Sequence, residues 1–214
     1  MKIGILGTGM VGNTIGKKLI ELGHAVMMGS RTADNEKAAA FVKDNGSNAS
    51  QGSFEDAAKF GEVIFLCTKG EATLDILKLA KPENFKTKTV IDISNPLDFS
   101  KGMPPSLFIS NTDSLGEHVQ AALPDAHVVK SLNIVNCEVM VNPKKSNGDP
   151  TMFVCGNNAD AKTKVLEILT SFGWNDIIDL GDITNARATE MMLPIWLRTY
   201  MATGNGYIGF KIVR

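Results

Sequence analysis

The hexapeptide GTGMVG, residues 7–12, constrains the fold of this chain more than any other segment. It follows a short apolar run and precedes a segment with helical spacing, which is the context that GxGxxG requires in a dinucleotide-binding fold. Such glycines allow a tight turn, a close approach of the backbone to a pyrophosphate, and close packing of helix on strand. The helix then offers unpaired N–H groups and the positive end of its dipole to the phosphates. The alternative is a glycine-rich turn without a ligand, and the predicted contacts are Gly7, Thr8, Gly9, Met10, Val11 and Gly12.

Short β-rich runs alternate with helical segments along the chain. This alternation predicts an α/β fold of the Rossmann-like, doubly wound type, with a mostly parallel sheet and a small C-terminal extension of helix and strand. Pro194 should kink the last helix, because proline lacks a backbone donor and clashes with the preceding turn. The expected strands are residues 2–6, 25–28, 63–67, 89–93, 127–131 and 152–155, and the expected helices are residues 10–22, 35–43, 71–79, 160–172 and 186–203.

The second expected strand ends in MMGSRT, residues 27–32, where proteins that bind NAD place an acidic residue. This segment contains no acid, and Arg31 instead offers a planar guanidinium that matches phosphate oxygens bidentately. An acid at position 29 would repel a 2′-phosphate, whereas Gly29 leaves room for one. The pattern therefore favours NADP over NAD, and the predicted contacts are Ser30, Arg31 and Thr32.

The composition argues against several classes of function. Twenty-two basic and 23 acidic residues leave a net charge of -1 without a basic tract, so nucleic acid is not an expected partner. Cys67, Cys137 and Cys155 lie in apolar runs without metal-ligand spacing, so we expect free thiols, no disulfide and no metal site. The sequence contains neither an apolar run of about 18 residues nor a separate leader, so we expect a cytoplasmic protein without a membrane partner.

No pattern of acid–base catalysis stands out in the sequence. The three histidines share no motif, and GxSxG and HExxH are absent, so no catalytic side chain is assigned. Hydride transfer between two flat rings suits such a site, because it needs mainly alignment and exclusion of water. The second ring would bind beyond the carboxyl ends of the strands, where an asparagine either hydrogen-bonds the ring or merely forms a turn. The predicted contacts at these strand ends are Thr68, Lys69, Gly70, Asn95 and Pro96 for the cofactor, and Asn133 for the substrate.

The C-terminal run MMLPIWLRTYM, residues 191–201, is rich in methionine and aromatic residues. Such a stripe is more often core or subunit interface than the wall of a ligand site. A mobile lid over a flat ring is the less favoured interpretation. The following GNGYIG, residues 204–209, is expected to be a close-packing turn rather than a second phosphate loop.

Six segments in matching order resemble the NADPH-dependent coenzyme F-420 reductase family: GTGMVG, GSR, SNP, VVKSLN, PTMFVCG and NARATEMMLPIW. The resemblance spans nearly the whole chain, and the cytosolic NADPH-binding domain of six-transmembrane ferrireductases looks similar too. It implies an enzyme that moves a hydride between NADP(H) and an 8-hydroxy-5-deazaflavin. By this resemblance, residues 8–11 would face the pyrophosphate and nicotinamide, Ser30 and Arg31 the 2′-phosphate, and Asn133 the deazaflavin. Similar family members are usually dimers, which implies a homodimer with the Met-rich C-terminal helix as its interface.

These observations predict an NADP-dependent oxidoreductase with NADP(H) as cofactor. Coenzyme F-420, a flavin or a similar flat molecule would be the small-molecule acceptor. A Rossmann domain should occupy residues 1–136, and a small C-terminal domain, residues 137–214, should close the hydride-transfer cleft. One alternative is a non-catalytic NADP(H)-binding redox sensor. Another is a reductase of a small carbonyl or imine, for which Lys130 or Lys69 would have to supply the proton.

Overall fold

In the computed structural model, which describes residues 1–214, eight strands form a single sheet and two more form a small hairpin. The strands of the sheet are β1 (Lys2–Leu6), β2 (Ala25–Ser30), β3 (Ala49–Ser53), β4 (Val63–Leu66), β5 (Thr89–Asp92), β8 (His127–Ser131), β9 (Thr151–Gly156) and β10 (Asp176–Asp179), and those of the hairpin are β6 (Leu97–Asp98) and β7 (Ser106–Leu107). The helices are α1 (Met10–Glu21), α2 (Glu36–Asn45), α3 (Phe54–Phe60), α4 (Thr73–Ala80), α5 (Leu115–Ala122), α6 (Cys137–Val141), α7 (Ala159–Phe172) and α8 (Ala186–Thr203).

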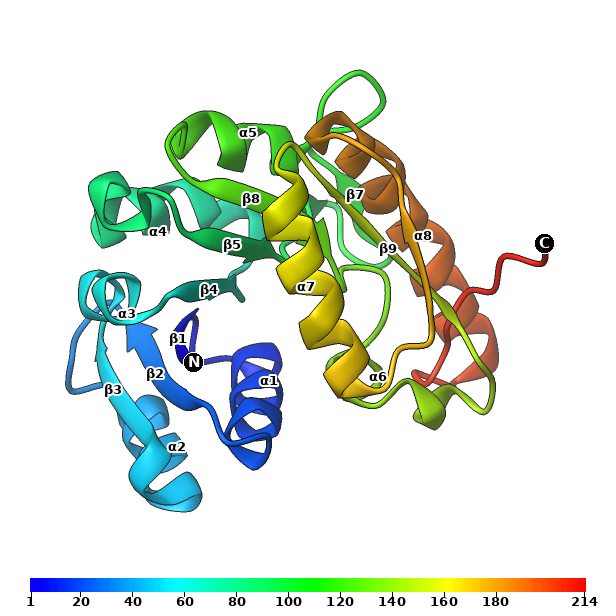
Figure 1. Ribbon diagram of the computed structural model, residues 1–214. Coiled ribbons are helices and arrows are strands. Elements are labelled where there is room, and N and C mark those ends of the chain that lie inside the picture. Colours follow the sequence, from blue (N-terminus) through cyan, green and yellow to red (C-terminus); the bar gives the residue numbers. More distant parts are fainter.

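The strand order across the sheet is β10-β9-β8-β5-β4-β1-β2-β3, and helices cover both faces (Figure 1). All neighbouring strands are parallel except β8 and β9, so β9 and β10 run opposite to the other six. The predicted doubly wound, mostly parallel sheet is therefore confirmed. β9 and β10 extend this same sheet, so its hydrogen bonding continues past the predicted domain boundary at residue 136. The strand order reverses direction between β1 and β4, and in such folds a ligand binds at the carboxyl ends of the strands beside this point.

Alternation of side chains along the strands creates one core on each face of the sheet. In β4 all four residues are buried: Val63 and Phe65 join the core under α1, α2, α6 and α7, and Ile64 and Leu66 join the core under α3, α4 and α5. A strand buried on both faces has a mostly apolar sequence, and the apolar runs VIFL of β4 and VI within β5 made these strands predictable.

The sequence pattern did not predict β3 and α3, which follow one another at the edge of the sheet. β3 has the polar sequence ASQGS, and α3 is only seven residues long. A capping box between Ser53 and Asp56 starts α3, and this Ser-x-x-Asp spacing was the available signal. Gly4 of β1 lets α3 approach closely, because a β-carbon there would lie 2.3 Å from the Ala57 carbonyl oxygen.

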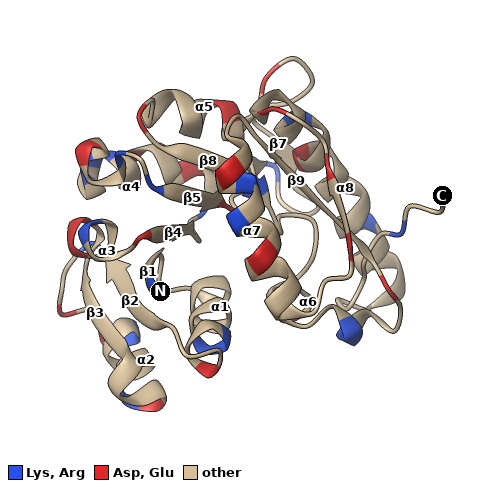
Figure 2. Ribbon diagram, in the orientation of Figure 1, with Lys and Arg blue, Asp and Glu red and all other residues tan.

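α8 has the bounds predicted from the sequence and continues through Pro194 as one helix. None of the helices combines the length and the apolarity that crossing a bilayer requires. Among the helices that cover the sheet, α3, α4 and α7 carry interspersed basic and acidic residues (Figure 2).

A buried ion cluster ties α8 to the centre of the sheet. The Lys130 ammonium of β8 lies 2.9 Å from Asp92 Oδ2 of β5 and 2.7 Å from Glu190 Oε1 of α8, and all three side chains are at most 2% exposed. It also donates to the Ser94 carbonyl oxygen at 2.5 Å. Burial by itself would lower the pKa of Lys130, but the two carboxylates outweigh it and hold this pKa above its ordinary value. The second negative charge is balanced at the N-terminus of α5, where two backbone N–H groups donate to Glu190, each at 2.9 Å.

Replacing Lys130 by Met should lower the free energy of unfolding by about 3–5 kcal/mol, because two carboxylates would stay buried without their cation. Urea unfolding followed by circular dichroism measures this change. Lys78→Met is the matched control, since Lys78 and its partner Asp75 are 75% and 77% exposed, and it should cost at most about 0.5 kcal/mol. Equal losses in the two variants would contradict the role assigned to the cluster.

Candidate functional site

The turn between β1 and α1 has the geometry of a phosphate-binding loop. Gly7 adopts a φ of 130°, and a β-carbon there would lie 2.3 Å from the Cys67 carbonyl oxygen. Gly12 packs equally closely, with its hypothetical β-carbon 2.3 Å from the Gly7 carbonyl oxygen. Gly9 has open space around it, and no side chain caps the first turn of α1. The loop therefore presents unpaired N–H groups to an open surface, as a bound pyrophosphate requires.

The end of β2 lies beside this loop, because β1 and β2 pair directly and Gly7 N–H donates to the Gly29 carbonyl oxygen. Ser30 is buried and its hydroxyl donates to the Thr32 carbonyl oxygen, which shapes the turn. Arg31 and Thr32 are exposed, and Arg31 makes no ion pair within the chain. The guanidinium is therefore available to an anionic group that lies along the loop.

Gly29 itself is required by packing. A β-carbon at this position would lie 2.7 Å from the Ala57 β-carbon of α3. An aspartate could not occupy position 29 whatever the cofactor, so the missing acid has a structural cause in addition to the electrostatic one. Of the predicted contacts around the phosphates and the ribose, Gly7, Thr8, Gly9, Gly12, Ser30, Arg31 and Thr32 lie along the ends of β1 and β2, outside the cavity described next.

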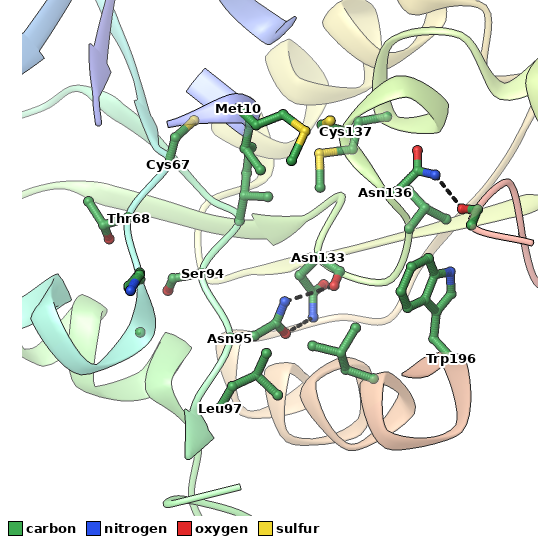
Figure 3. A pocket seen from close by; sticks show the side chains of 18 of the residues that line it. Met10, Cys67, Thr68, Ser94, Asn95, Leu97, Asn133, Asn136, Cys137 and Trp196 are labelled. Atoms are coloured by element: carbon green, nitrogen blue, oxygen red, sulfur yellow. Dashed lines mark hydrogen bonds between the residues drawn. The ribbon is translucent and has the colours of Figure 1, made fainter. Parts of the chain in front are cut away.

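A cavity of about 820 Å³ opens at the carboxyl ends of β4, β5 and β8, next to the start of α1 (Figure 3). This volume lies in the upper part of the range of about 300–1,000 Å³ that is common for small-molecule sites. Sulfur atoms of Met10, Cys67 and Cys137 lie on one side of it. Seven of the predicted contacts line the cavity, namely Met10, Val11, Thr68, Lys69, Gly70, Asn95 and Asn133.

Pro96, also predicted to contact the cofactor, does not line the cavity. It is buried, and its carbonyl oxygen accepts from Phe108 N–H beside the small hairpin. Gly70, by contrast, is where the ends of β4 and β5 meet. Its hypothetical β-carbon would lie 2.0 Å from the Asn95 carbonyl oxygen, so only glycine fits this contact.

Asn95 and Asn133 form a reciprocal amide pair across the cavity floor. Asn95 Nδ2 donates to the Asn133 backbone carbonyl at 2.8 Å, and Asn133 Nδ2 donates to Asn95 Oδ1 at 3.0 Å. Asn133, predicted as a substrate contact, is only 2% exposed. The pair uses one amide hydrogen of each asparagine, so the side-chain oxygen of Asn133 and the second amide hydrogen of each residue are not used by it.

The C-terminal helix and the segment after it form the opposite wall, and the sequence pattern favoured a different role for them. Leu193, Trp196 and Tyr200 line the cavity from α8, followed by Gly206 and Tyr207. The helical spacing of the first three places them on one side of α8, and that spacing was the signal available in the sequence. Other lining residues that were missed as contacts include Cys67, Glu71, Cys137 and Glu138.

The segment after α8 is held over the cavity by two hydrogen bonds. Asn136 Nδ2 donates to the Gly206 carbonyl oxygen, while Asn136 Oδ1 caps α6 by accepting from Val139 N–H at 3.0 Å. Trp196 Nε1 donates to the Ile208 carbonyl oxygen at 3.1 Å. As expected, the GNGYIG segment packs closely, because a β-carbon at Gly209 would lie 2.5 Å from the Pro150 β-carbon.

Besides two cysteines, the titratable side chains that line the cavity are Lys69, Glu71, Glu138, Tyr200 and Tyr207. Burial, together with the Asp92 carboxylate, raises the pKa of the Cys67 thiol well above its ordinary value, so this thiol stays neutral. Lys130 lies outside the cavity and its ammonium is fully engaged by Asp92, Ser94 and Glu190. Of the two lysines considered as proton donors, only Lys69 reaches the cavity wall.

Comparison with known proteins gives consistent results. Residues 2–96 match the protein family described as coenzyme F420-dependent NADP oxidoreductase. The F420-dependent NADP reductase of Methanocaldococcus jannaschii is 31% identical over 218 residues, which cover 96% of each chain. The metalloreductase STEAP3 of Rattus norvegicus is 28% identical over 95% of this chain, which spans only 39% of that protein. The crystal structure of a candidate F420-dependent NADP reductase from Arthrobacter sp. is 43% identical, has a TM-score of 0.95, and covers 100% of both chains.

Replacing Arg31 by Ala should weaken NADPH binding by at least about 1 to 2 kcal/mol and leave NADH binding nearly unchanged, because only NADPH carries a 2′-phosphate. Calorimetric titration of both nucleotides measures the two affinities. Lys43→Ala removes an exposed cation from the last turn of α2 and serves as the control for net charge. If the unmodified protein binds NADH as tightly as NADPH, the assignment of Arg31 is wrong.

Proposed function

The chain belongs to the family of coenzyme F420-dependent NADP oxidoreductases, and from this premise we propose that it transfers a hydride between NADP(H) and a deazaflavin of the coenzyme F420 type. Membership of the family makes it an NADP-dependent oxidoreductase. The observation that carries the choice of acceptor is the cavity at the strand ends. It is lined mainly by apolar side chains, adjoins the phosphate-binding loop, and is large enough for two ring systems.

The residues at the strand ends fit NADP(H). The uncapped start of α1, with open space at Gly9, would hold the pyrophosphate, and Arg31 would hold the 2′-phosphate. Met10, Val11 and Thr68 line the part of the cavity nearest this loop and would hold the nicotinamide end. When bound, NADPH supplies the hydride.

The contribution of the protein to the reaction is orientation and exclusion of water. The Asn95–Asn133 pair fixes the floor of the cavity, and Trp196 with the residues after α8 forms its far wall. Holding two rings in contact supplies several kcal/mol of rate acceleration without an acid–base residue. A carbonyl or imine reductase that uses Lys130 as its acid is disfavoured, because that ammonium is buried outside the cavity.

Oxidation of NADPH by the purified protein tests the proposal against five acceptors: an 8-hydroxy-5-deazaflavin, FMN, FAD, a quinone and a ferric chelate. We expect the deazaflavin to give the highest kcat/KM, because the matching family and the 31% identical relative are both described as F420-dependent. Preference for another acceptor would replace the deazaflavin in the proposal. Tight NADPH binding without turnover of any acceptor would instead support the redox sensor.

We also propose that the protein forms a homodimer through α8. Met191 and Ile195 lie one helical turn apart on this helix and are 41% and 55% exposed. Ile195→Asp would place a charge in that interface and should shift the molar mass measured by light scattering from dimer to monomer. An unmodified protein that is monomeric at micromolar concentration would contradict this proposal.

A further inference from the structure

The cavity has two walls of different chemistry. The wall at the strand ends carries hydroxyl and amide groups, including Thr68, Ser94 and Asn95. Across the cavity from Thr68 and Ser94, the indole of Trp196 projects from α8 (Figure 3). A ring bound beside the strand ends would therefore have an aromatic surface on its other side.

The Trp196 ring is fixed in place before any ligand arrives. Its only polar atom, Nε1, is used in the hydrogen bond to the Ile208 carbonyl oxygen. The Tyr200 ring, one helical turn away, stacks on it with centroids 5.8 Å apart and planes 16° from parallel. The indole N–H is therefore not available to a ligand, so Trp196 offers the cavity only the apolar and π contacts of its ring.

Such a surface suits one class of acceptor. The indole is the most electron-rich aromatic side chain, and its stacking is most favourable with a flat, electron-poor polycyclic ring. An oxidised deazaflavin or flavin has this character. A ferric chelate with an aliphatic carboxylate ligand has no flat aromatic face to stack, so it gains nothing from the indole.

We propose that Trp196, supported by Tyr200, is the stacking platform that holds the acceptor ring, and that it makes the site specific for flat, electron-poor polycyclic acceptors. This inference rests on the proposed function, because it takes the second ring to be a hydride acceptor. The acceptor would lie between the indole and the end of the cavity lined by Met10 and Thr68. Trp196 is then a specificity-determining residue that takes no part in proton transfer.

Steady-state kinetics with an 8-hydroxy-5-deazaflavin that lacks a charged side chain test the platform. Trp196→Leu should raise the KM for the deazaflavin about tenfold, and Trp196→Phe should raise it about threefold because a smaller ring remains. The KM for NADPH should stay within about twofold in both variants, and reduction of a ferric chelate, where measurable, should not respond. Trp174→Phe is the matched control. Trp174 is 1% exposed and does not line the cavity, and it meets a lining residue only through its hydrogen bond to the Met140 backbone carbonyl, so its replacement should leave both KM values within about twofold.

Fluorescence gives a second readout that needs no turnover. The chain has two tryptophans, so Trp174→Phe leaves Trp196 as the only indole emitter. Titration with the same deazaflavin, corrected for absorption, should quench this emission. Should the control variant fold poorly by circular dichroism, the quenching lost between the unmodified protein and Trp196→Phe gives the same information.

The outcomes separate this inference from the proposed function. If the unmodified protein reduces the deazaflavin while both Trp196 variants keep its KM and the Trp196 emission is not quenched, the platform is wrong and the hydride transfer stands. If no acceptor is reduced but Trp196 is quenched, the platform stands and the proposed reaction is wrong. The absence of both turnover and quenching overturns both.

Discussion

The buried Lys130 ammonium is the group on which the arrangement of the site depends. A charge removed from water is stable only when it is fully paired, and here the partners come from three different places: β5, α8 and the turn after β5. Because Glu190 also accepts two N–H groups at the start of α5, one cluster joins two central strands to two helices that are distant in the sequence. The last helix, which carries Trp196, is thereby fixed relative to the strand ends. The two walls of the cavity are therefore held in position by a charge that lies outside the cavity.

The residues at the end of β2 are constrained both by the packing of α3 and by recognition of the cofactor. The end of β2 lacks the acid of NAD-binding proteins, which the electrostatics of a 2′-phosphate explain. Packing at Gly29 gives an independent reason for the missing acid, because α3 approaches so closely that no side chain fits at this position. The close approach of α3 and the exposed, unpaired Arg31 are two separate features of the same strand end. Packing would exclude an acid at position 29 with either cofactor, so the expectation of NADP at this strand end depends on Arg31.

The parts of the fold that could be predicted are those governed by local rules. Continuous apolar runs identified β4 and β5, and glycine spacing identified the phosphate loop, while β1, β8 and α8 have the predicted bounds. β3 was not predicted, because an edge strand can be polar and its sequence pattern then resembles that of a loop. At the site, the rule that ligands bind at the carboxyl ends of parallel strands correctly brought Thr68, Asn95 and Asn133 together. It did not reveal the wall formed by α8. Helical spacing puts Leu193, Trp196 and Tyr200 on one side of this helix, but no local pattern says which distant segment that side faces.

The sulfur atoms on one side of the cavity have a consequence for the durability of the protein. Met10 is 75% exposed, Cys137 is 7% exposed, and their sulfur atoms lie on the same side of the cavity. Thioethers and neutral thiols are soft and polarizable, so they adapt to a flat ring more readily than branched aliphatic side chains do. Peroxide converts a thioether to a sulfoxide, which places a permanent dipole on a surface shaped for an apolar face. The lifetime of the site in a cell is therefore linked to the oxidants around it and to the enzymes that repair methionine.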